Sequence, residues 1–382
     1  MNARFFVNPF FLYILIFLSV LLLYSLEWSY LQPSLSIDLT IFFISTFVFG
    51  LIFFVLYNNI KENYKINGLS SDRIIWLILI FGAFVEFAYQ GAIPFLEIMR
   101  GRDFKYNLFG VPVFHVFFLP YISAVGILSF YKFLILRKKS RLYIFLFSLL
   151  FVVLIFNRGA ILFILISAFF VYLKLKKNIS IRKMVITFFA TLFLLYLFGA
   201  MGNYRMLASG YKSDDVILTI GQATPNFYNS KVPSEFLWSY LYIVTPYANL
   251  QFQTNNVSSN ADKFDVFKNQ ILIDFIQKRV YVDEKFNNNL IVDEFNVSTM
   301  YGKSVQLSGL FGAYISFFWF VCNVFFITVI TPKNYRVVVS AIFSTMAILT
   351  CFTNVIVFAG FILQPIFVAI FVRFKFGNFN LI

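Results

Sequence analysis

Long apolar runs follow one another along most of the chain and are separated by short polar segments. Residues 9–26 and 39–57 form the first two runs, and residues 306–330 form one of the last. A helix of roughly 20 apolar residues matches the hydrocarbon thickness of a bilayer. We therefore expect these runs to be membrane-spanning helices.

Composition excludes a water-soluble globular protein. Of the 382 residues, 60% are hydrophobic and only 13% are charged, whereas a soluble domain carries about 25% charged residues. A chain with so few polar groups cannot cover a surface that faces water, so its solvent must be lipid.

The basic residues predict how the spans are oriented. Lysine and arginine concentrate in residues 61–73, 137–141, 174–183 and 332–336, which are short segments between apolar runs. Basic loops of this kind remain in the cytoplasm. The net charge of +14 is therefore mostly an orientation signal, and we expect no nucleic-acid partner.

Together, the runs and loops predict an all-α polytopic membrane protein. We expect about ten transmembrane helices, with spans one to seven in residues 1–200 and spans eight to ten in residues 306–382. Both termini would be cytoplasmic. One large loop between spans seven and eight, residues 201–305, would face the other side of the membrane.

The large loop is nearly neutral, so it is not a polybasic lipid-binding arm. Its residues 235–252 are rich in aromatic and aliphatic side chains, and Trp and Tyr favour the membrane interface. We interpret them as a helix that lies on or dips into the outer surface and is broken near Pro246. Residues 266–280 carry an apolar stripe with helical spacing and predict a further helix.

Arg158 lies between two short apolar runs, residues 142–156 and 160–173. Basic clusters on both sides require a hairpin with Asn157-Arg158-Gly159 at its outer tip. A helix of about 15 residues rises only about 22 Å, whereas the hydrocarbon core is about 30 Å thick. We therefore expect Arg158 below the outer surface, where a guanidinium needs a water-filled cavity or an anionic partner. The alternatives are that its side chain extends to the lipid headgroups, or that the helices continue into the flanking basic residues and reach full length.

Further arginines are predicted on the same outer side. Arg205 follows Asn203 and Tyr204 at the end of span seven, and Arg100 and Arg102 lie in the loop before span four. Arginine binds phosphate through two parallel hydrogen bonds. With the hairpin arginine, these residues would suit the diphosphate of a lipid-linked donor. Each of them alone is explained equally well as a surface arginine.

The sequence offers few candidates for a general base. His115, the only histidine, lies just inside span four and could act as a base, although an interfacial histidine with satisfied hydrogen bonds is the commoner case. Glu86 is the only carboxylate clearly within a span, where it would face a cavity or pair with an arginine. Glu235, Asp214 and Asp215 are further candidates, and their spacing does not choose between them.

No motif for a cofactor or a metal occurs in the sequence. It has no Walker loop, dinucleotide fingerprint, nucleophile elbow or Asp-x-Asp cluster. A single histidine excludes a multi-histidine metal site, and Cys322 and Cys351 fall inside apolar runs as small hydrophobic residues. We therefore expect no cofactor and no bound metal.

Four short stretches follow one another between residues 90 and 250. They are residues 91–112 (with GAIPF and YNLFGVP) followed by His115, residues 157–159 (NRG), residues 198–205 (FGAMGNYR), and residues 221–250 (with GQATP and PSEFLWSYLYIVTPYANL). In this order, and on one side of the membrane, they resemble the bacterial O-antigen polymerase family, the oligosaccharide repeat unit polymerases. The family often has Ser-Arg-Gly at the second stretch, and Ser-Pro-Leu where this chain has Thr245-Pro246-Tyr247. Residues after 251 show no such resemblance.

The resemblance implies a glycosyltransferase in a bacterial cell inner membrane, with residues 201–305 as a large periplasmic loop. Its substrate would be an oligosaccharide repeat carried on undecaprenyl diphosphate. A hydroxyl of the incoming repeat attacks the anomeric carbon of the growing glycan, and the lipid diphosphate leaves. This chemistry needs an electrostatic clamp for the leaving group and a base for the hydroxyl.

The resemblance also implies partners and residue roles. Partners would be the lipid-linked oligosaccharide, membrane lipid, and the chain-length regulator and flippase of the same pathway. The implied residues are Arg158 and Arg205 for the clamp, with Arg100 or Arg102 assisting, Asn203 and Tyr204 for substrate binding, and Glu235 or His115 as the base.

Three other functions stay open from the sequence. A related O-antigen ligase would use the same donor and transfer glycan to lipid A-core. A lipid-linked oligosaccharide flippase would need polar residues along a path through the spans, whereas the span centres here are almost free of charge. A purely structural membrane protein is the remaining alternative.

Overall fold

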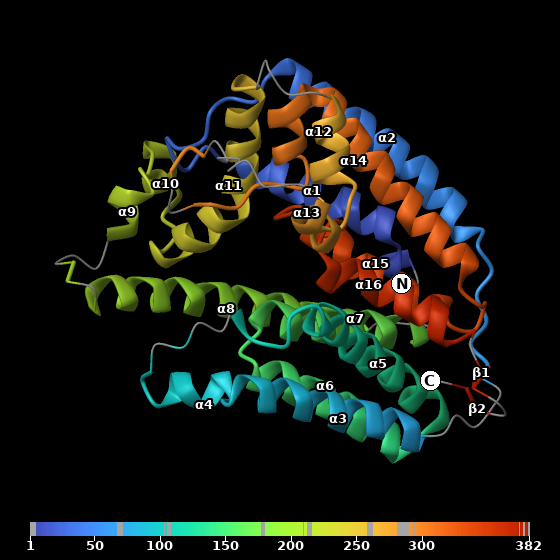
Figure 1. Ribbon diagram of the computed structural model, residues 1–382. Helices are drawn as coiled ribbons and strands as arrows, with labels where there is room; N and C mark the ends of the chain where they lie inside the picture. The colour runs from blue at the N-terminus through green and yellow to red at the C-terminus, as the bar shows by residue number, and fades with distance from the viewer. Residues whose placement is uncertain are drawn as a thin grey trace.

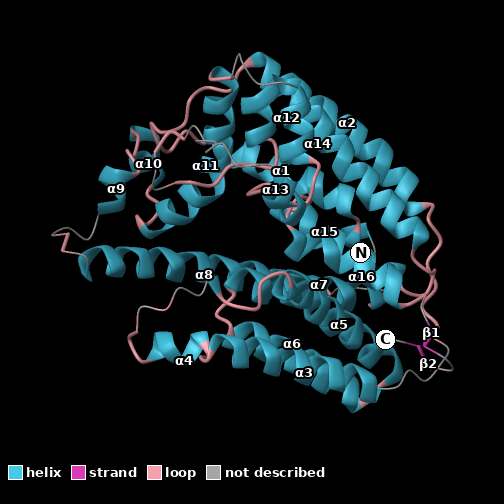
Figure 2. Cartoon of the chain, viewed as in Figure 1, coloured by secondary structure: helices cyan, strands magenta, loops and turns pink. Residues whose placement is uncertain are grey.

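The computed structural model describes residues 5–66, 72–102, 104, 108–176, 180–208, 210–211, 216–257, 263–280, 290–292, 295–373, 375–376 and 379–380. Asp214, Asp215 and residues 106–107 lie outside the described residues. Helices form most of the described chain (Figure 2). The described strands, β1 (Lys375–Phe376) and β2 (Phe379–Asn380), form one short antiparallel pair. The prediction of an all-α fold is therefore confirmed apart from this pair.

The helices are labelled in chain order in Figure 1. Their bounds are η1 Phe5–Val7, α1 Pro9–Tyr24, α2 Ile37–Asn58, α3 Asp72–Gln90, α4 Pro94–Met99, α5 Phe114–Leu136, α6 Lys139–Leu154, α7 Arg158–Leu175, α8 Ile181–Ala208, α9 Val216–Ile220, α10 Pro225–Ser230, α11 Glu235–Asn255, α12 Lys263–Gln270, α13 Asp274–Val280, α14 Gly302–Ile330, α15 Arg336–Leu349 and α16 Ala359–Phe371.

Five of the described helices are long and apolar enough to cross a membrane: α2, α5, α7, α14 and the part Val185–Ala208 of α8. Helices α1, α15 and α16 are apolar but shorter. Large apolar side chains such as Leu22, Ile44 and Phe188 are more than half exposed. Apolar side chains that cover both the inner and the outer side of a helix are typical of a protein surrounded by lipid. The fold is that of a helical membrane protein with several spans.

Polar residues mark where several helices begin. Asn8 accepts a hydrogen bond from the backbone N–H of Phe10 (2.9 Å) at the start of α1. Ser36 caps α2 and Asn157 caps α7 in the same way. These side chains satisfy N–H groups that have no partner within the helix. In a mostly apolar sequence they define the first turn of each helix.

Helix α15 lies at the centre of the bundle. Its residues 337–347 are all buried, and it packs against α1, α7 and α16. The hydroxyls of Ser167 and Thr345 lie 2.9 Å apart and join α7 to α15 by a hydrogen bond. Helix α5 packs against α6, α7 and α16. Spans from both ends of the chain therefore share one core.

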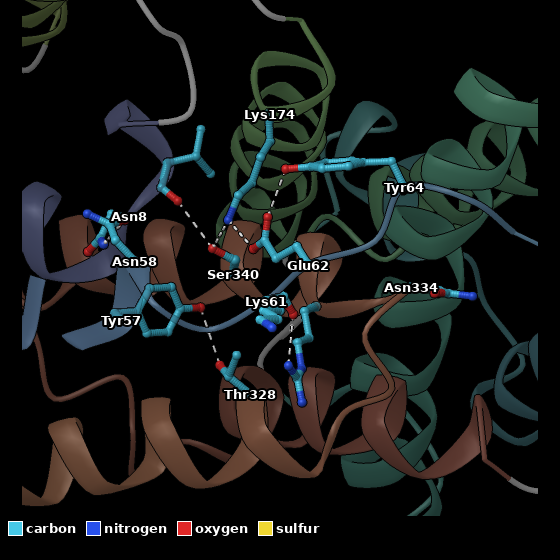
Figure 3. A network of polar contacts seen from close by, with 12 residues as sticks. Asn8, Tyr57, Asn58, Lys61, Glu62, Tyr64, Lys174, Thr328, Asn334 and Ser340 are labelled. Carbon is cyan, nitrogen blue, oxygen red and sulfur yellow. Dashed lines mark hydrogen bonds and ion pairs between the residues drawn. The ribbon is translucent and has the colours of Figure 1, made fainter. Parts of the chain in front are cut away.

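Several loops meet at one end of the bundle, on the side where both chain termini lie (Figure 1). Lys174 Nζ donates hydrogen bonds to the Glu62 carboxylate (2.5 Å) and to Ser340 Oγ (2.6 Å), as Figure 3 shows. Arg336 Nη1 donates to the backbone carbonyl of Lys61 (2.8 Å). Three of the segments that carry the basic clusters are thus joined at this end.

A second group of segments meets at the opposite end, near α9, α10 and α11 (Figure 1). Ser29 Oγ donates to the carbonyl oxygen of Gly221 (2.5 Å), which joins the loop after α1 to the large loop. The Met300 N–H donates to the carbonyl oxygen of Thr350 (2.8 Å), which joins the start of α14 to the segment after α15. These segments carry none of the four basic clusters.

The first half of the large loop differs from the prediction. Residues 235–255 form one helix, α11, which continues through Pro246 instead of breaking there. It packs against α8, α14 and α1, and Tyr247 and Leu250 are fully buried. The aromatic and aliphatic side chains that suggested a surface helix instead fill contacts with neighbouring helices.

Residues 266–280, predicted as one helix, belong to α12 and α13 with a break at residues 271–273. The Asp274 N–H donates to the carbonyl of Val357 (2.7 Å), and its carboxylate accepts from the N–H of Ala359 (2.9 Å) at the start of α16. The break brings Asp274 to the end of α16. An apolar stripe cannot reveal such a contact between distant segments.

Candidate functional site

The hairpin predicted around Arg158 is present, because α6 and α7 pack against each other through a short turn. Asn157 Oδ1 accepts a hydrogen bond from the Ala160 N–H (2.9 Å), so Arg158 is the first residue of α7. Arg158 is exposed, and its guanidinium lies 4.7 Å from the centre of the Phe156 ring. A cation at a helix N-terminus is opposed by the helix dipole. The charge of Arg158 therefore does not stabilise α7 and is available for an anion.

Two further arginines lie on the short segment at helix α4. Arg100 and Arg102 donate to the two carboxylate oxygens of Glu97, at 3.0 and 2.6 Å. The hydrogen bond from Arg102 holds the pKa of Glu97 below its usual range, and the charges of both arginines add to this effect. The Phe95 ring lies 6.5 Å from the Phe156 ring, between centroids. This group carries one excess positive charge and is linked to the hairpin tip through the two rings.

His115, at the start of α5, lies beside the buried Glu86 side chain of α3. His115 Nδ1 lies 3.2 Å from Glu86 Oε2, and the Glu86 side chain has no exposed surface. The Val111 N–H also donates to Glu86 Oε2 (3.1 Å). Gly110 has φ +107°, and a Cβ there would lie 2.5 Å from Glu86 Oε2 and 2.6 Å from the His115 ring. Only glycine allows the loop to pass this close to the pair.

The pair gives Glu86 a different partner from the expected one. The ionisable side chain that the structure places beside its carboxylate is that of His115, 29 positions along the chain, and not an arginine. A carboxylate next to one ring nitrogen can orient an imidazole. The spacing of the two residues in the sequence did not indicate that they lie together.

An apolar groove opens along α5, the same helix that carries His115. It has a volume of about 360 Å³ and is formed by α3, α5 and α16. His115 directly follows Phe114, which lines the groove, in the first turn of α5. Its lining residues are Ile78, Phe114, Phe117, Phe118, Tyr121, Phe367 and Phe371. The groove was not predicted from the sequence, although its lining residues on α5 recur at the spacing of one helix face.

Asn203 and Glu235 lie where α8 crosses α11. Asn203 Oδ1 accepts a hydrogen bond from Trp238 Nε1 (2.7 Å), and Glu235 accepts one from the Tyr196 hydroxyl (3.3 Å). Both predicted site residues thus bond across the contact between the two helices. Their observed role is to join α8 to α11.

Tyr204 and Arg205 lie beside this crossing on exposed parts of α8, with 76% of the Tyr204 surface accessible. Asn203 and Arg205 are separated by about 200° around the helix axis, so Arg205 points away from the side that contacts α11. Helix α8 packs against α9 and α11, whereas the hairpin tip is linked to α4. The predicted site residues therefore fall into two groups, one around Arg158 and one around Arg205.

The fold defines the class: a polytopic helical membrane protein. Among the described residues, no group of three or more His, Cys, Asp or Glu side chains could hold a metal ion. No protein-family model, curated protein or solved structure matches the chain.

Proposed function

We propose that the protein polymerises oligosaccharide repeat units carried on undecaprenyl diphosphate, at the periplasmic face of a bacterial inner membrane. One observation carries the proposal: helix α5 begins with His115 beside the buried Glu86 carboxylate and then lines an apolar groove. The arginines of α4 and of the hairpin tip lie on two segments that contact each other through Phe95 and Phe156. A lipid-linked donor has three parts that match these features: an isoprenoid chain, a diphosphate and a sugar.

The arginines suit the leaving group. When the glycosidic bond breaks, the lipid diphosphate carries the developing negative charge. Arg158 is exposed for such an anion, and Arg100 and Arg102 can exchange one of their bonds to Glu97 for a phosphate oxygen. Positive groups held in place before the reaction stabilise this charge without reorganisation.

The reaction transfers the growing glycan to a hydroxyl of the incoming repeat. The hydroxyl oxygen attacks the anomeric carbon, and the bond from that carbon to the diphosphate oxygen breaks. The hydroxyl proton moves to His115, whose ring would be oriented by the Glu86 carboxylate at 3.2 Å. The new glycosidic bond and a free undecaprenyl diphosphate are the products.

The topology proposed with this function has about ten spans and cytoplasmic termini. The end where Lys174, Glu62 and Ser340 meet would be cytoplasmic, and the end with Ser29 and Gly221 periplasmic. Substrate would then reach the site from the outer leaflet. A chain-length regulator and a flippase of the same pathway are the proposed partners.

A strain that lacks the gene tests the proposal through its lipopolysaccharide ladder. Wild type should restore long chains, whereas Arg158→Ala should leave core plus a single repeat. Arg182→Ala is the matched control, because it removes an exposed arginine from the first turn of α8, within a basic cluster outside the proposed site. Long chains restored by Arg158→Ala, at a normal amount in the membrane, would refute the site. A deletion strain with no repeat on the core would instead indicate a ligase.

A further inference from the structure

A polar cleft lies at the same end of the bundle as the large loop. It has a volume of about 500 Å³, within the range of about 300–1,000 Å³ that is usual for ligand sites. Its walls come from α11, α12, α13, the start of α14 and the segment between α15 and α16. The cleft is separate from the apolar groove and shares no lining residue with it.

Six of the sixteen lining residues carry uncharged amide side chains. An amide both donates and accepts hydrogen bonds, and a sugar hydroxyl does the same, so a row of amides is complementary to a neutral glycan. The amide side chains are Gln253, Asn269, Gln270, Gln277, Asn296 and Asn354.

The floor of the cleft is ordered by hydrogen bonds. Asn354 Nδ2 donates to Gln270 Oε1 (2.9 Å), and the hydroxyl of Ser304 donates to the same oxygen (3.2 Å). Asn354 is 9% exposed, and its Oδ1 accepts no hydrogen bond from the described residues. Buried amide oxygens generally have a donor. The Oδ1 atom is itself buried, and the hydrogen bonds to Gln270 fix the position of the Asn354 side chain in the lining of the cleft.

Charge in the cleft is balanced, which disfavours an anionic ligand. Lys303 and Asp274 are its charged lining residues. The Asp274 carboxylate is already bonded to backbone N–H groups at Phe275 and Ala359 (2.8 and 2.9 Å). The rings of Phe352 and Phe358 complete the lining and offer apolar surface to the C–H side of a sugar ring.

One aromatic contact connects a helix of the cleft to the apolar groove. The Phe275 ring on α13 lies 5.1 Å from the Phe117 ring on α5, measured between centroids. Phe117 lines the groove, and Asp274 and Gln277 of α13 line the cleft. Helix α13 therefore contacts both features.

We infer that this cleft binds uncharged sugar residues of the glycan and so selects the repeat unit. The inference rests on the proposed function for the identity of the glycan, whereas the cleft itself is defined by its own residues. The apolar groove and the arginines would hold the lipid diphosphate, and the amides would hold the sugars.

The test uses purified protein in nanodiscs and, as probe, the lipid-free oligosaccharide released by mild acid from the carrier lipid of the host strain. Saturation-transfer NMR should detect its binding to wild type. The double variant Asn269→Leu/Asn296→Leu keeps side-chain size but removes two amides, and it should abolish the signal. Asn226→Leu is the matched control on α10, outside the cleft, and should bind as wild type does.

Kinetics separate this inference from the proposed function. With the lipid-linked repeat, the double variant should raise KM at least tenfold and leave kcat within about twofold, because its changes lie away from the reacting bond. Equal binding and equal KM in the folded double variant would overturn the inference, even if wild type polymerises. Displacement of the sugar by sodium pyrophosphate would also overturn it, since the cleft would then hold the diphosphate. Wild type that binds the sugar but does not polymerise would refute the proposed function alone.

Discussion

At the level of single residues, a fully buried carboxylate beside the only histidine has the clearest chemical meaning. Glu86 has no exposed surface and lies 3.2 Å from His115 Nδ1. A buried charge without a partner is strongly destabilising. The loop at Gly110 and Val111 closes over the pair and supplies a backbone donor. A histidine that only faces the surface would not require a buried carboxylate and a glycine loop packed against it.

His115→Gln should lower the rate of polymerisation by roughly 10²- to 10⁴-fold, the usual contribution of a general base. Glutamine retains a hydrogen-bonding side chain but cannot take the proton. Glu86→Gln should lower kcat less, since it acts through the ring. Both rates are measured in nanodiscs. Activity of His115→Gln within threefold of wild type would remove the histidine from the mechanism.

The residues predicted for the site met different outcomes for physical reasons. The hairpin with Arg158 at its tip could be predicted because a charge between two short apolar runs is unusual in sequence. The contacts of Asn203 and Glu235 could not be predicted, because their side chains bond to Trp238 and Tyr196 across two helices. Contacts of this kind depend on how the helices cross, which apolar periodicity does not encode.

At the level of elements, the close crossing of α8 and α11 depends on two glycines. A Cβ at Gly199 would lie 1.9 Å from the backbone oxygen of Glu235, and one at Gly202 would lie 2.9 Å from the Trp238 ring. Such distances are far inside van der Waals contact, so any side chain at Gly199 forces the helices apart. The crossing holds the end of α8 that carries Arg205.

Gly199→Ala should destabilise the protein by about 1–3 kcal/mol, the usual cost of overpacking. Gly360→Ala on α16 is the matched control, because its Cβ would meet nothing within 4 Å. Thermal unfolding in detergent, followed by tryptophan fluorescence, compares the two variants. Equal midpoints for Gly199→Ala and wild type would contradict the close packing of α8 on α11.

The elements also show the limits of sequence periodicity. Most apolar runs became helices close to the predicted bounds, since lipid requires every backbone group to bond within its own helix. The interpretation failed in the large loop, where α11 is a buried part of the bundle and residues 266–280 are divided between two helices. There the structure depends on contacts with α14 and α16, which lie far along the chain.

At the level of the whole molecule, the two ends of the bundle differ in chemistry. One end joins the segments with basic clusters, and the other carries α4, the hairpin tip, the large loop and the polar cleft. The groove and the cleft each combine residues from at least three helices. Apolar runs and charges considered segment by segment do not predict such sites, because they depend on how the helices pack.

Cysteine labelling tests this polarity. In a variant without Cys322 and Cys351, single cysteines replace Asn226 on α10 and Lys333 between α14 and α15, both exposed. A membrane-impermeant maleimide should label the first in intact spheroplasts and the second only after permeabilisation. The reverse pattern would invert the proposed orientation, and labelling of both from outside would contradict a membrane between them.

Reconstitution tests the central claim most directly. Purified protein in nanodiscs receives undecaprenyl-diphosphate-linked oligosaccharide as its only glycan, and products are separated by gel electrophoresis. The account predicts a ladder whose steps differ by one repeat, with one undecaprenyl diphosphate released per bond formed, and no ladder with Arg158→Ala. Folded wild-type protein that leaves the oligosaccharide at its starting length would contradict it.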